Sequence, residues 1–110
     1  MNVTLFHGYP DRVGKRSIWV GSGNGPASYV GGSAPTDQII INQFQFYIDA
    51  ITEISVSVSG TYYAIAQPSV AGVRANWFLR YYTASTGAEV SNATNLSAEK
   101  FIISGFGGFS

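Results

Sequence analysis

The chain alternates short apolar runs with stretches rich in glycine, proline, serine and asparagine, and this spacing predicts β-strands. The clearest strand covers residues 54–58, where Ile54, Val56 and Val58 alternate with serines. Such a two-residue period is typical of a strand with one buried face. Residues 76–83 also alternate but carry aromatic side chains on both faces. We therefore expect this second strand to be central in its sheet, or covered on its outer face by a neighbour.

Other apolar runs predict strands at residues 3–6, 17–20, 62–66 and 101–103. Residues 38–51 also have a two-residue period, with a phase slip near Asn42 that indicates a bulge or a short helical turn. Gly60 and Thr61 suit a turn, so the strands on either side of them are predicted to form a hairpin. Residues 21–35, which hold five glycines and two prolines, predict a long loop that is attached to the domain through Tyr29 and Val30.

This series of short strands, without a long amphipathic helical stretch, predicts an all-β fold. We expect a single-domain antiparallel β-sandwich or jelly-roll-like barrel with long loops and extended termini, and 110 residues suit one domain. Residues 1–13 predict an N-terminal arm. Residues 105–110, in which Phe106 and Phe109 lie among glycines, predict a flexible C-terminal tail. The two rings of this tail either fold back onto the domain or insert into a neighbouring subunit.

The composition is low in charge and high in aromatic side chains. Only 11% of residues are charged, against about 25% in a typical soluble domain. The formal net charge is zero and 15% of residues are aromatic. A neutral chain has no long-range field to attract nucleic acid or an anionic membrane, so we expect neither as a partner. Either part of the surface is reserved for a protein partner, or the chain is a tightly packed domain with a hydroxyl-rich exterior.

Several classes of chemistry lack the residues they need. The chain has no cysteine, which excludes disulfides, thiolate metal sites and cysteine nucleophiles and fits a reducing cytoplasm. The longest apolar run is only a few residues, far below the roughly 20 that cross a bilayer. The residues after Met1 lack the basic and apolar regions of a signal peptide. We therefore expect neither a membrane span nor a secretion signal.

The candidate catalytic groups are few and scattered. His7 is the only histidine, and no cysteine accompanies it. Asp49 and Glu53 would lie about 13 Å apart on one strand, which is too far for a glycosidase pair. The glycines of residues 21–25 resemble a phosphate-binding loop only superficially, because Pro26 prevents the helix that such a loop needs. We predict a non-enzymatic protein with no catalytic residues, no metal site and no cofactor.

Several elements follow one another along the chain in a distinctive order, and they include an apolar segment that ends at Ile48 and Asp49 and a terminal strand followed by glycine. The others are a basic Gly-Lys-Arg before a strand at residues 14–16, Ser-Tyr-Val-Gly-Gly at 28–32, the aromatic strand at 77–82 and Gly-Ala-Glu-Val-Ser-Asn-Ala-Thr-Asn-Leu-Ser-Ala-Glu at 87–99. With this order, the chain from about Gly14 onward resembles the small cement or decoration proteins that coat the heads of tailed bacteriophages. The Tyr-x-Gly-Gly element and the stretch that begins at Glu89 are the most specific parts of the resemblance.

The resemblance implies a compact β domain that is made in the cytoplasm of a bacterial host and located on the outer surface of the virion capsid. It implies a homotrimer that bridges subunits of the major capsid protein and stabilises the shell. Where related chains often carry an acid after the glycine pair, this chain has Ser33. The candidate contacts with capsid protein or with another copy of the chain are the basic cluster and the aromatic surfaces: Arg12, Lys15, Arg16, Tyr29, Phe44, Phe46, Phe78, Arg80, Tyr82, Phe106 and Phe109.

Two other functions remain open from the sequence. The first is a tail, neck or fibre component of the virion, since such components use similar β domains. The second is a carbohydrate-binding β-sandwich, which would need an exposed aromatic platform on which a sugar ring can stack. The candidate platforms are Trp19, Tyr62, Tyr63 and Trp77.

Overall fold

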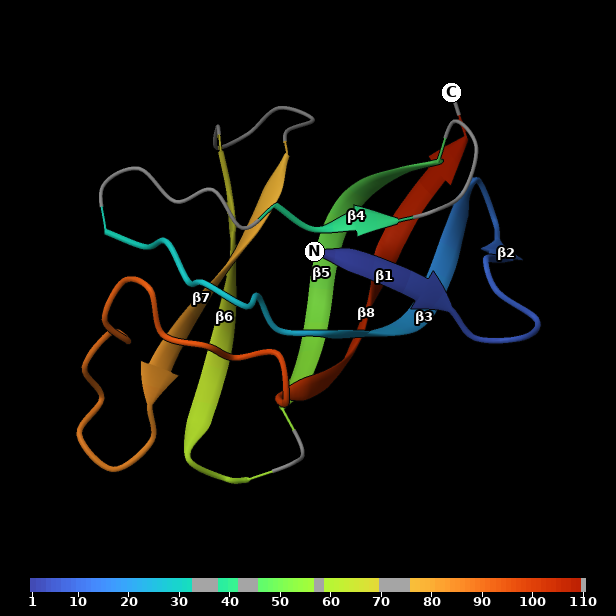
Figure 1. The fold of residues 1–110 in the computed structure, drawn as a ribbon. Coiled ribbons are helices and arrows are strands. Elements are labelled where there is room, and N and C mark those ends of the chain that lie inside the picture. The colour runs from blue at the N-terminus through green and yellow to red at the C-terminus, as the bar shows by residue number, and fades with distance from the viewer. Residues whose placement is uncertain (33–37, 42–45, 57–58, 70–75, 110) are drawn as a thin grey trace.

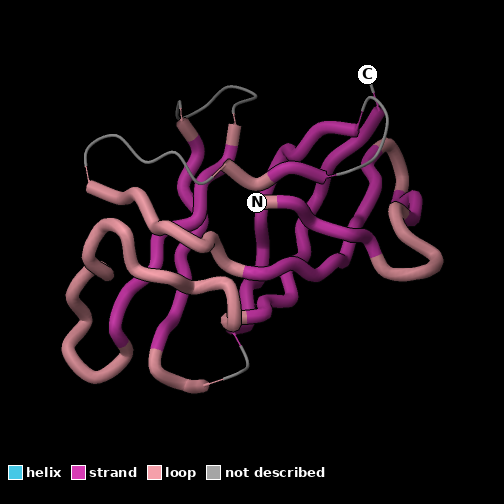
Figure 2. The backbone as a smooth tube through the Cα atoms, in the orientation of Figure 1, coloured by secondary structure: helices cyan, strands magenta, loops and turns pink. Residues whose placement is uncertain are grey.

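The computed structural model describes residues 1–32, 38–41, 46–56, 59–69 and 76–109. These residues form an all-β protein without a helix, as the sequence predicted. A large curled sheet and a small second sheet lie side by side (Figures 1 and 2). The strands are β1 (Asn2–Leu5), β2 (Asp11–Val13), β3 (Arg16–Asn24), β4 (Ile40–Ile41), β5 (Phe46–Val56), β6 (Tyr62–Pro68), β7 (Trp77–Thr83) and β8 (Lys100–Phe109).

The large sheet is built around β3 and β8, which pair antiparallel along eight positions, from Ser17 opposite Gly107 to Asn24 opposite Lys100. Its strand order is β4-β1-β3-β8-β5, and β2 pairs with β3 off this path. Both β1 and β2 therefore lie on the edge of β3 that faces away from β8, whereas β5 lies on the far edge of β8. In Figure 1 the β2 hairpin and β5 accordingly lie on opposite sides of the β3–β8 pair.

The small sheet is the antiparallel pair β6–β7, with Tyr62 opposite Thr83 at one end and Pro68 opposite Trp77 at the other. Single β-bridges, Gln38 to Phe78 and Tyr82 to Glu89, also contact β7. The prediction of a hairpin across Gly60 and Thr61 is wrong. The strands on either side, β5 and β6, do not pair with each other, because β5 forms its ladder with β8 and β6 forms its ladder with β7. The turn is where the chain leaves one sheet and enters the other.

The core lies between the two sheets and also takes side chains from two loops. Tyr29 and Tyr81 meet there edge to face, with ring centroids 5.9 Å apart and planes at 79°. Burying each large apolar side chain contributes roughly 1.5–3 kcal/mol, so the loops stabilise the fold as the strands do. The buried apolar residues are Val3, Trp19, Tyr29, Ile39, Leu79, Tyr81, Val90, Leu96, Phe101 and Ile103.

Both termini belong to the large sheet. The expected N-terminal arm contains β1 and β2, and β3 extends to Asn24, into the predicted loop. The expected C-terminal tail is a continuation of β8, which runs to Phe109. Gly105 is required at this position because a Cβ atom there would overlap the carbonyl oxygen of Ala50 in β5. The glycines of the last strand therefore let β5 pass close by, and residues 105–109 form a strand in place of the predicted flexible tail.

Candidate functional site

A hydrogen-bonded group, which we call the Tyr29 cluster (Tyr29, Gly31, Gly32, Arg80, Glu89 and Asn92), joins segments that are distant in sequence. The Tyr29 hydroxyl donates to Oε2 of Glu89 at 2.7 Å and accepts from the backbone N–H of Tyr81 at 3.2 Å. Arg80 Nη1 donates to the same carboxylate oxygen at 3.1 Å. The N–H of Gly32 donates to both carboxylate oxygens, at 3.2 and 3.3 Å. The Glu89 carboxylate therefore accepts hydrogen bonds from three residues of the cluster, Tyr29, Gly32 and Arg80.

Backbone hydrogen bonds hold residues 25–32 against residues 89–99. The Tyr29 N–H donates to the carbonyl of Thr94 at 3.0 Å, and the Ala93 N–H donates back to the carbonyl of Tyr29 at 2.8 Å. The Gly31 N–H donates to Oδ1 of Asn92 at 3.0 Å. A Cβ atom on Gly31 would overlap both the Glu89 carboxylate and the Tyr29 ring. The two most specific elements of the phage resemblance are therefore direct contact partners in the fold.

Burial and hydrogen bonding set the ionisation of the cluster. Burial, reinforced by the hydrogen bond to Glu89, raises the pKa of Tyr29 to about 12. The hydrogen bond from Tyr29 lowers the pKa of Glu89, and contacts with Gly32 and Arg80 lower it further, against the opposing effect of burial. At neutral pH Tyr29 is a proton donor and Glu89 an acceptor. The sequence predicted that Tyr29 contacts a partner. Its side chain is instead fully buried and packs in the core.

A second candidate site is the outer face of the small sheet, which we call the outer face (Tyr63, Ile65, Gln67, Phe78, Arg80 and Tyr82). The inward side chains of β6 pack on the core, while Tyr63, Ile65 and Gln67 are exposed on the other side. Register places Tyr82, Arg80 and Phe78 directly across from them. The Tyr63 and Tyr82 rings stack, with centroids 5.3 Å apart and planes at 15°.

The polar groups of the outer face bond to one another. Arg80 Nε donates to Oε1 of Gln67 at 2.5 Å, while its Nη1 reaches Glu89. The sequence predicted that Phe78, Arg80 and Tyr82 share a face, and the structure places all three on it. Sequence reasoning missed Ile65, which is 50% exposed. The two-residue period of residues 62–66 contained the signal, since it aligns Ile65 with Tyr63.

The basic cluster lies on the β2–β3 hairpin, where Val13 pairs with Arg16 across Gly14 and Lys15. Arg12, Lys15 and Arg16 are all exposed. The hairpin is held locally, since Arg12 Nε donates to the carbonyl of Gly14 and the Arg12 N–H donates to the Asp11 carboxylate, both at 2.9 Å. The three predicted basic residues are therefore brought together on one projecting turn.

Three of the remaining aromatic candidates, Phe46, Phe106 and Phe109, lie on β5 and β8 of the large sheet. Phe46 and Phe109 are opposite each other in the β5–β8 ladder, and their rings meet edge to face at 5.3 Å. Phe109 is 53% exposed although it contacts its own domain. Phe106 is partly exposed and pairs with Ile18 and Ala50. Phe44 lies outside the described residues.

Most residues proposed for other functions do not form a site. Of the four candidate sugar platforms, Trp19 is fully buried, while Tyr62 and Trp77 pack against the core. Tyr63 is 39% exposed and so remains as a platform. His7 is exposed in the turn after β1. Within the described part of the chain, no group of three or more His, Asp or Glu residues is placed to hold a metal ion.

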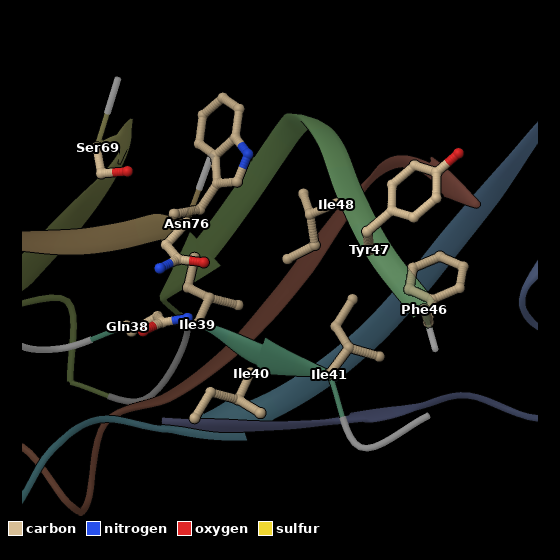
Figure 3. A pocket seen from close by; sticks show the side chains of 10 residues that line it. Gln38, Ile39, Ile40, Ile41, Phe46, Tyr47, Ile48, Ser69 and Asn76 are labelled. Atoms are coloured by element: carbon tan, nitrogen blue, oxygen red, sulfur yellow. The ribbon is translucent and has the colours of Figure 1, made fainter. Parts of the chain in front are cut away.

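An open cleft of about 440 Å³ lies between the two sheets (Figure 3). Its wall includes Ile39, Ile48 and Trp77, with Gln38 and Asn76 supplying polar groups. Its volume falls in the usual range for ligand pockets, roughly 300–1,000 Å³. We assign this cleft no ligand.

Comparisons with family models, with curated proteins and with solved structures give no match for this chain. Among the described residues, the structure contains no helix long and apolar enough to cross a membrane.

Proposed function

We propose that this chain is a structural, non-enzymatic cement protein of a tailed-phage head. In this role it binds the outer surface of the capsid as a homotrimer and bridges neighbouring subunits of the major capsid protein. The observation that carries the proposal is the outer face, which presents Tyr63, Ile65 and Phe78 on a sheet whose other side is packed on the core. Apolar patches of this kind on a soluble domain mark protein contacts.

The electrostatics of the outer face suit burial against protein. Arg80 is paired with Glu89 and Gln67, so its charge enters an interface already compensated. A cement protein also binds many equivalent sites of a lattice, so several weak contacts per oligomer suffice. The Tyr29 cluster supports the proposal in a second way, since the two elements that resemble phage cement proteins form one structural unit.

Co-sedimentation with purified heads of the phage that encodes the chain tests the proposal. We expect the full chain to sediment with heads that lack it, and those heads to withstand higher temperature once it is bound. Ile65→Asp should weaken this binding at least about tenfold, because it places a charge in an apolar contact. Ile102→Asp is the matched control, since Ile102 is also an exposed strand isoleucine, 42% accessible, but lies on the large sheet.

A wild-type chain that never sediments with heads would contradict the proposal. Antibody labelling of virions, viewed by negative-stain microscopy, shows where on the virion the chain is located. Label on the tail, neck or fibre in place of the head would assign the chain to one of those structures.

The stacked Tyr63–Tyr82 pair favours one function of a different class. The stacked rings lie on the same sheet face as Arg80, and on this face a sugar ring could stack while a hydroxyl bonds to the guanidinium group. A carbohydrate-binding module predicts signals on a glycan array that Tyr63→Ala removes. An array without signals for the wild-type chain rules this alternative out.

A further inference from the structure

The segment that leads into β4 joins the two sheets into a nearly closed barrel. Gln38 forms a β-bridge with Phe78 in β7, and the N–H of Ile39 donates to the carbonyl of Trp77 at 2.8 Å. The next two residues are β4, the end of the path β4-β1-β3-β8-β5 in the large sheet. Hydrogen bonds therefore connect neighbouring strands from β5 through β8, β3, β1 and β4 to β7 and β6.

Within the described chain this circuit is interrupted between β5 and β6, at a place that we call the seam. The two strands are neighbours (Figure 1), but no ladder or bridge between described residues joins them. A closed barrel has no edge strands, whereas the seam leaves two strand edges facing each other. A groove of about 250 Å³ lies along the seam, lined by residues 51–54 of β5 and 64–66 of β6.

The backbone of β6 presents hydrogen-bonding groups to the seam. Tyr81 of β7 is opposite Ala64, but its carbonyl accepts from the Val90 N–H at 3.0 Å, on the side of β7 that faces away from β6. Tyr81 and Ala64 are therefore a non-hydrogen-bonded pair of the ladder, and the N–H and C=O of Ala64 point away from β7. The same alternation applies to Ala66. Neither alanine forms a backbone hydrogen bond on that side with a described residue.

The side chains along the seam are apolar with one charge. Ile51, Ile54 and Ile65 supply apolar surface to the groove, and Ile65 is 50% exposed. Glu53 is exposed at the groove and forms no ion pair with a described residue. The edge of β5 is irregular because its register shifts twice, and such bulges disfavour the pairing of an added strand. The regular edge of the seam is therefore that of β6.

We propose that the seam binds an extended strand of the partner chain, which pairs with the edge of β6 through Ala64 and Ala66. An extended backbone presents N–H and C=O groups to one side at every second residue, about 6.8 Å apart, which matches the spacing of the two alanines. The side chains that this strand turns into the groove are apolar, and a lysine or arginine of the strand faces Glu53. Ile65 also belongs to the outer face, so the seam and the outer face form one continuous contact.

The inference rests on the proposed function, in which the partner is the major capsid protein. Hydrogen–deuterium exchange of the full chain, free and bound to purified heads, tests it with single-amide resolution by mass spectrometry. We expect the amides of Ala64 and Ala66 to exchange rapidly in the free chain and at least about tenfold more slowly on heads. The amide of Ile65, which faces β7, is the internal control and should be protected in both states.

The possible outcomes separate the two proposals. A chain that sediments with heads while Ala64 and Ala66 exchange as fast as in the free chain overturns the seam contact and leaves capsid binding in place. A chain that never sediments with heads overturns both. Protection of the two amides in the free chain, together with self-association in solution, would show that a second copy occupies the seam and would also overturn the proposal.

A backbone variant tests the same contact by affinity. Ala64→Pro removes the N–H that faces the seam and leaves the hydrogen bonds between β6 and β7 in place, as proline requires at a strand edge. We expect it to weaken head binding at least about tenfold, whereas Ala64→Ser, which keeps the N–H, is the matched control. A folded Ala64→Pro chain that binds heads like the wild type overturns the proposal. Circular dichroism shows whether this variant folds, and if it does not, the exchange measurement decides.

A charge variant tests the cation expected opposite Glu53. Glu53→Lys should weaken head binding about tenfold, because it places like charges together. Asp11→Lys is the matched control, since it makes the same change of charge on β2, on the other side of the β3–β8 pair. Equal binding by the two variants overturns the assignment of a cation to this position.

Discussion

Tyr29 and Glu89 lie sixty positions apart in the chain, and the Tyr29 hydroxyl donates to the Glu89 carboxylate at 2.7 Å. This contact connects a glycine-rich loop with the connector that follows the small sheet. It also lies beside the outer face, because Arg80 bonds to the same carboxylate oxygen. Glu89 therefore links the buried Tyr29 to Arg80, which belongs to the outer face.

Removing the hydroxyl of Tyr29 tests the structural role of this contact. Tyr29→Phe should lower the free energy of unfolding by about 1–3 kcal/mol, because it leaves the buried Tyr81 N–H without its acceptor. Tyr63→Phe is the matched control, since Tyr63 lies on the exposed side of β6, and we expect a change within about 0.5 kcal/mol. Urea denaturation followed by tryptophan fluorescence measures both. Equal effects of the two substitutions would contradict the assignment.

The lowered pKa of Glu89 predicts loss of stability in acid. The carboxylate is stabilised in the folded state, so its contribution is complete above the ordinary pKa of 4.5 and is lost as pH falls through the lower folded value. Urea midpoints of the wild-type chain should therefore fall more steeply below pH 4.5 than those of Glu89→Gln. The comparison removes the effect of the other acids, which both proteins share. Parallel pH profiles would be inconsistent with a lowered pKa at Glu89.

Tyr29 gives the corresponding alkaline prediction. Its pKa is raised in the folded state, so its contribution is complete below the ordinary value of 10.0 and is lost as pH rises through about 12. Wild-type stability should decline over this interval, and the part of the decline due to Tyr29 should be missing in Tyr29→Phe. Ultraviolet absorbance at the phenolate band follows the titration directly. A Tyr29 that ionises near pH 10 in the folded protein would contradict this prediction.

The close passage of β5 over β8 predicts an intolerant glycine. Gly105→Ala should destabilise the fold by about 1–3 kcal/mol or more, because the new methyl group overlaps the carbonyl of Ala50 and the strands must separate. Ile102→Thr, an exposed change in the same strand, should cost no more than about 0.5 kcal/mol. Thermal unfolding by circular dichroism compares the two. If Gly105→Ala unfolds at the wild-type temperature, the close packing is not as described.

The Phe46–Phe109 contact predicts that the last residues of β8 contribute to stability. A double-mutant cycle with Phe46→Ala, Phe109→Ala and the double variant should give a coupling free energy of about 0.5–1.5 kcal/mol, as for other edge-to-face pairs. The cycle cancels the unrelated effects of each truncation. A coupling of zero would indicate that the Phe109 ring leaves its own domain and is available to a neighbouring subunit.

The sequence by itself determined the all-β class and the faces of the strands, because a two-residue period records which side chains are buried. It placed Phe78, Arg80 and Tyr82 on one face correctly, since alternation is a local property of a strand. It also indicated that Tyr29 is attached to the body of the domain, but not that Tyr29 is buried.

Only the tertiary structure decided which strands pair. The sequence predicted a hairpin across Gly60 and Thr61, whereas β5 joins β8 and β6 joins β7, because pairing depends on where the buried faces meet and not on proximity along the chain. The same reason explains Glu89, whose partners Tyr29 and Gly32 come from a distant loop. It also explains how the β2–β3 hairpin and β5 come to lie on opposite sides of the β3–β8 pair.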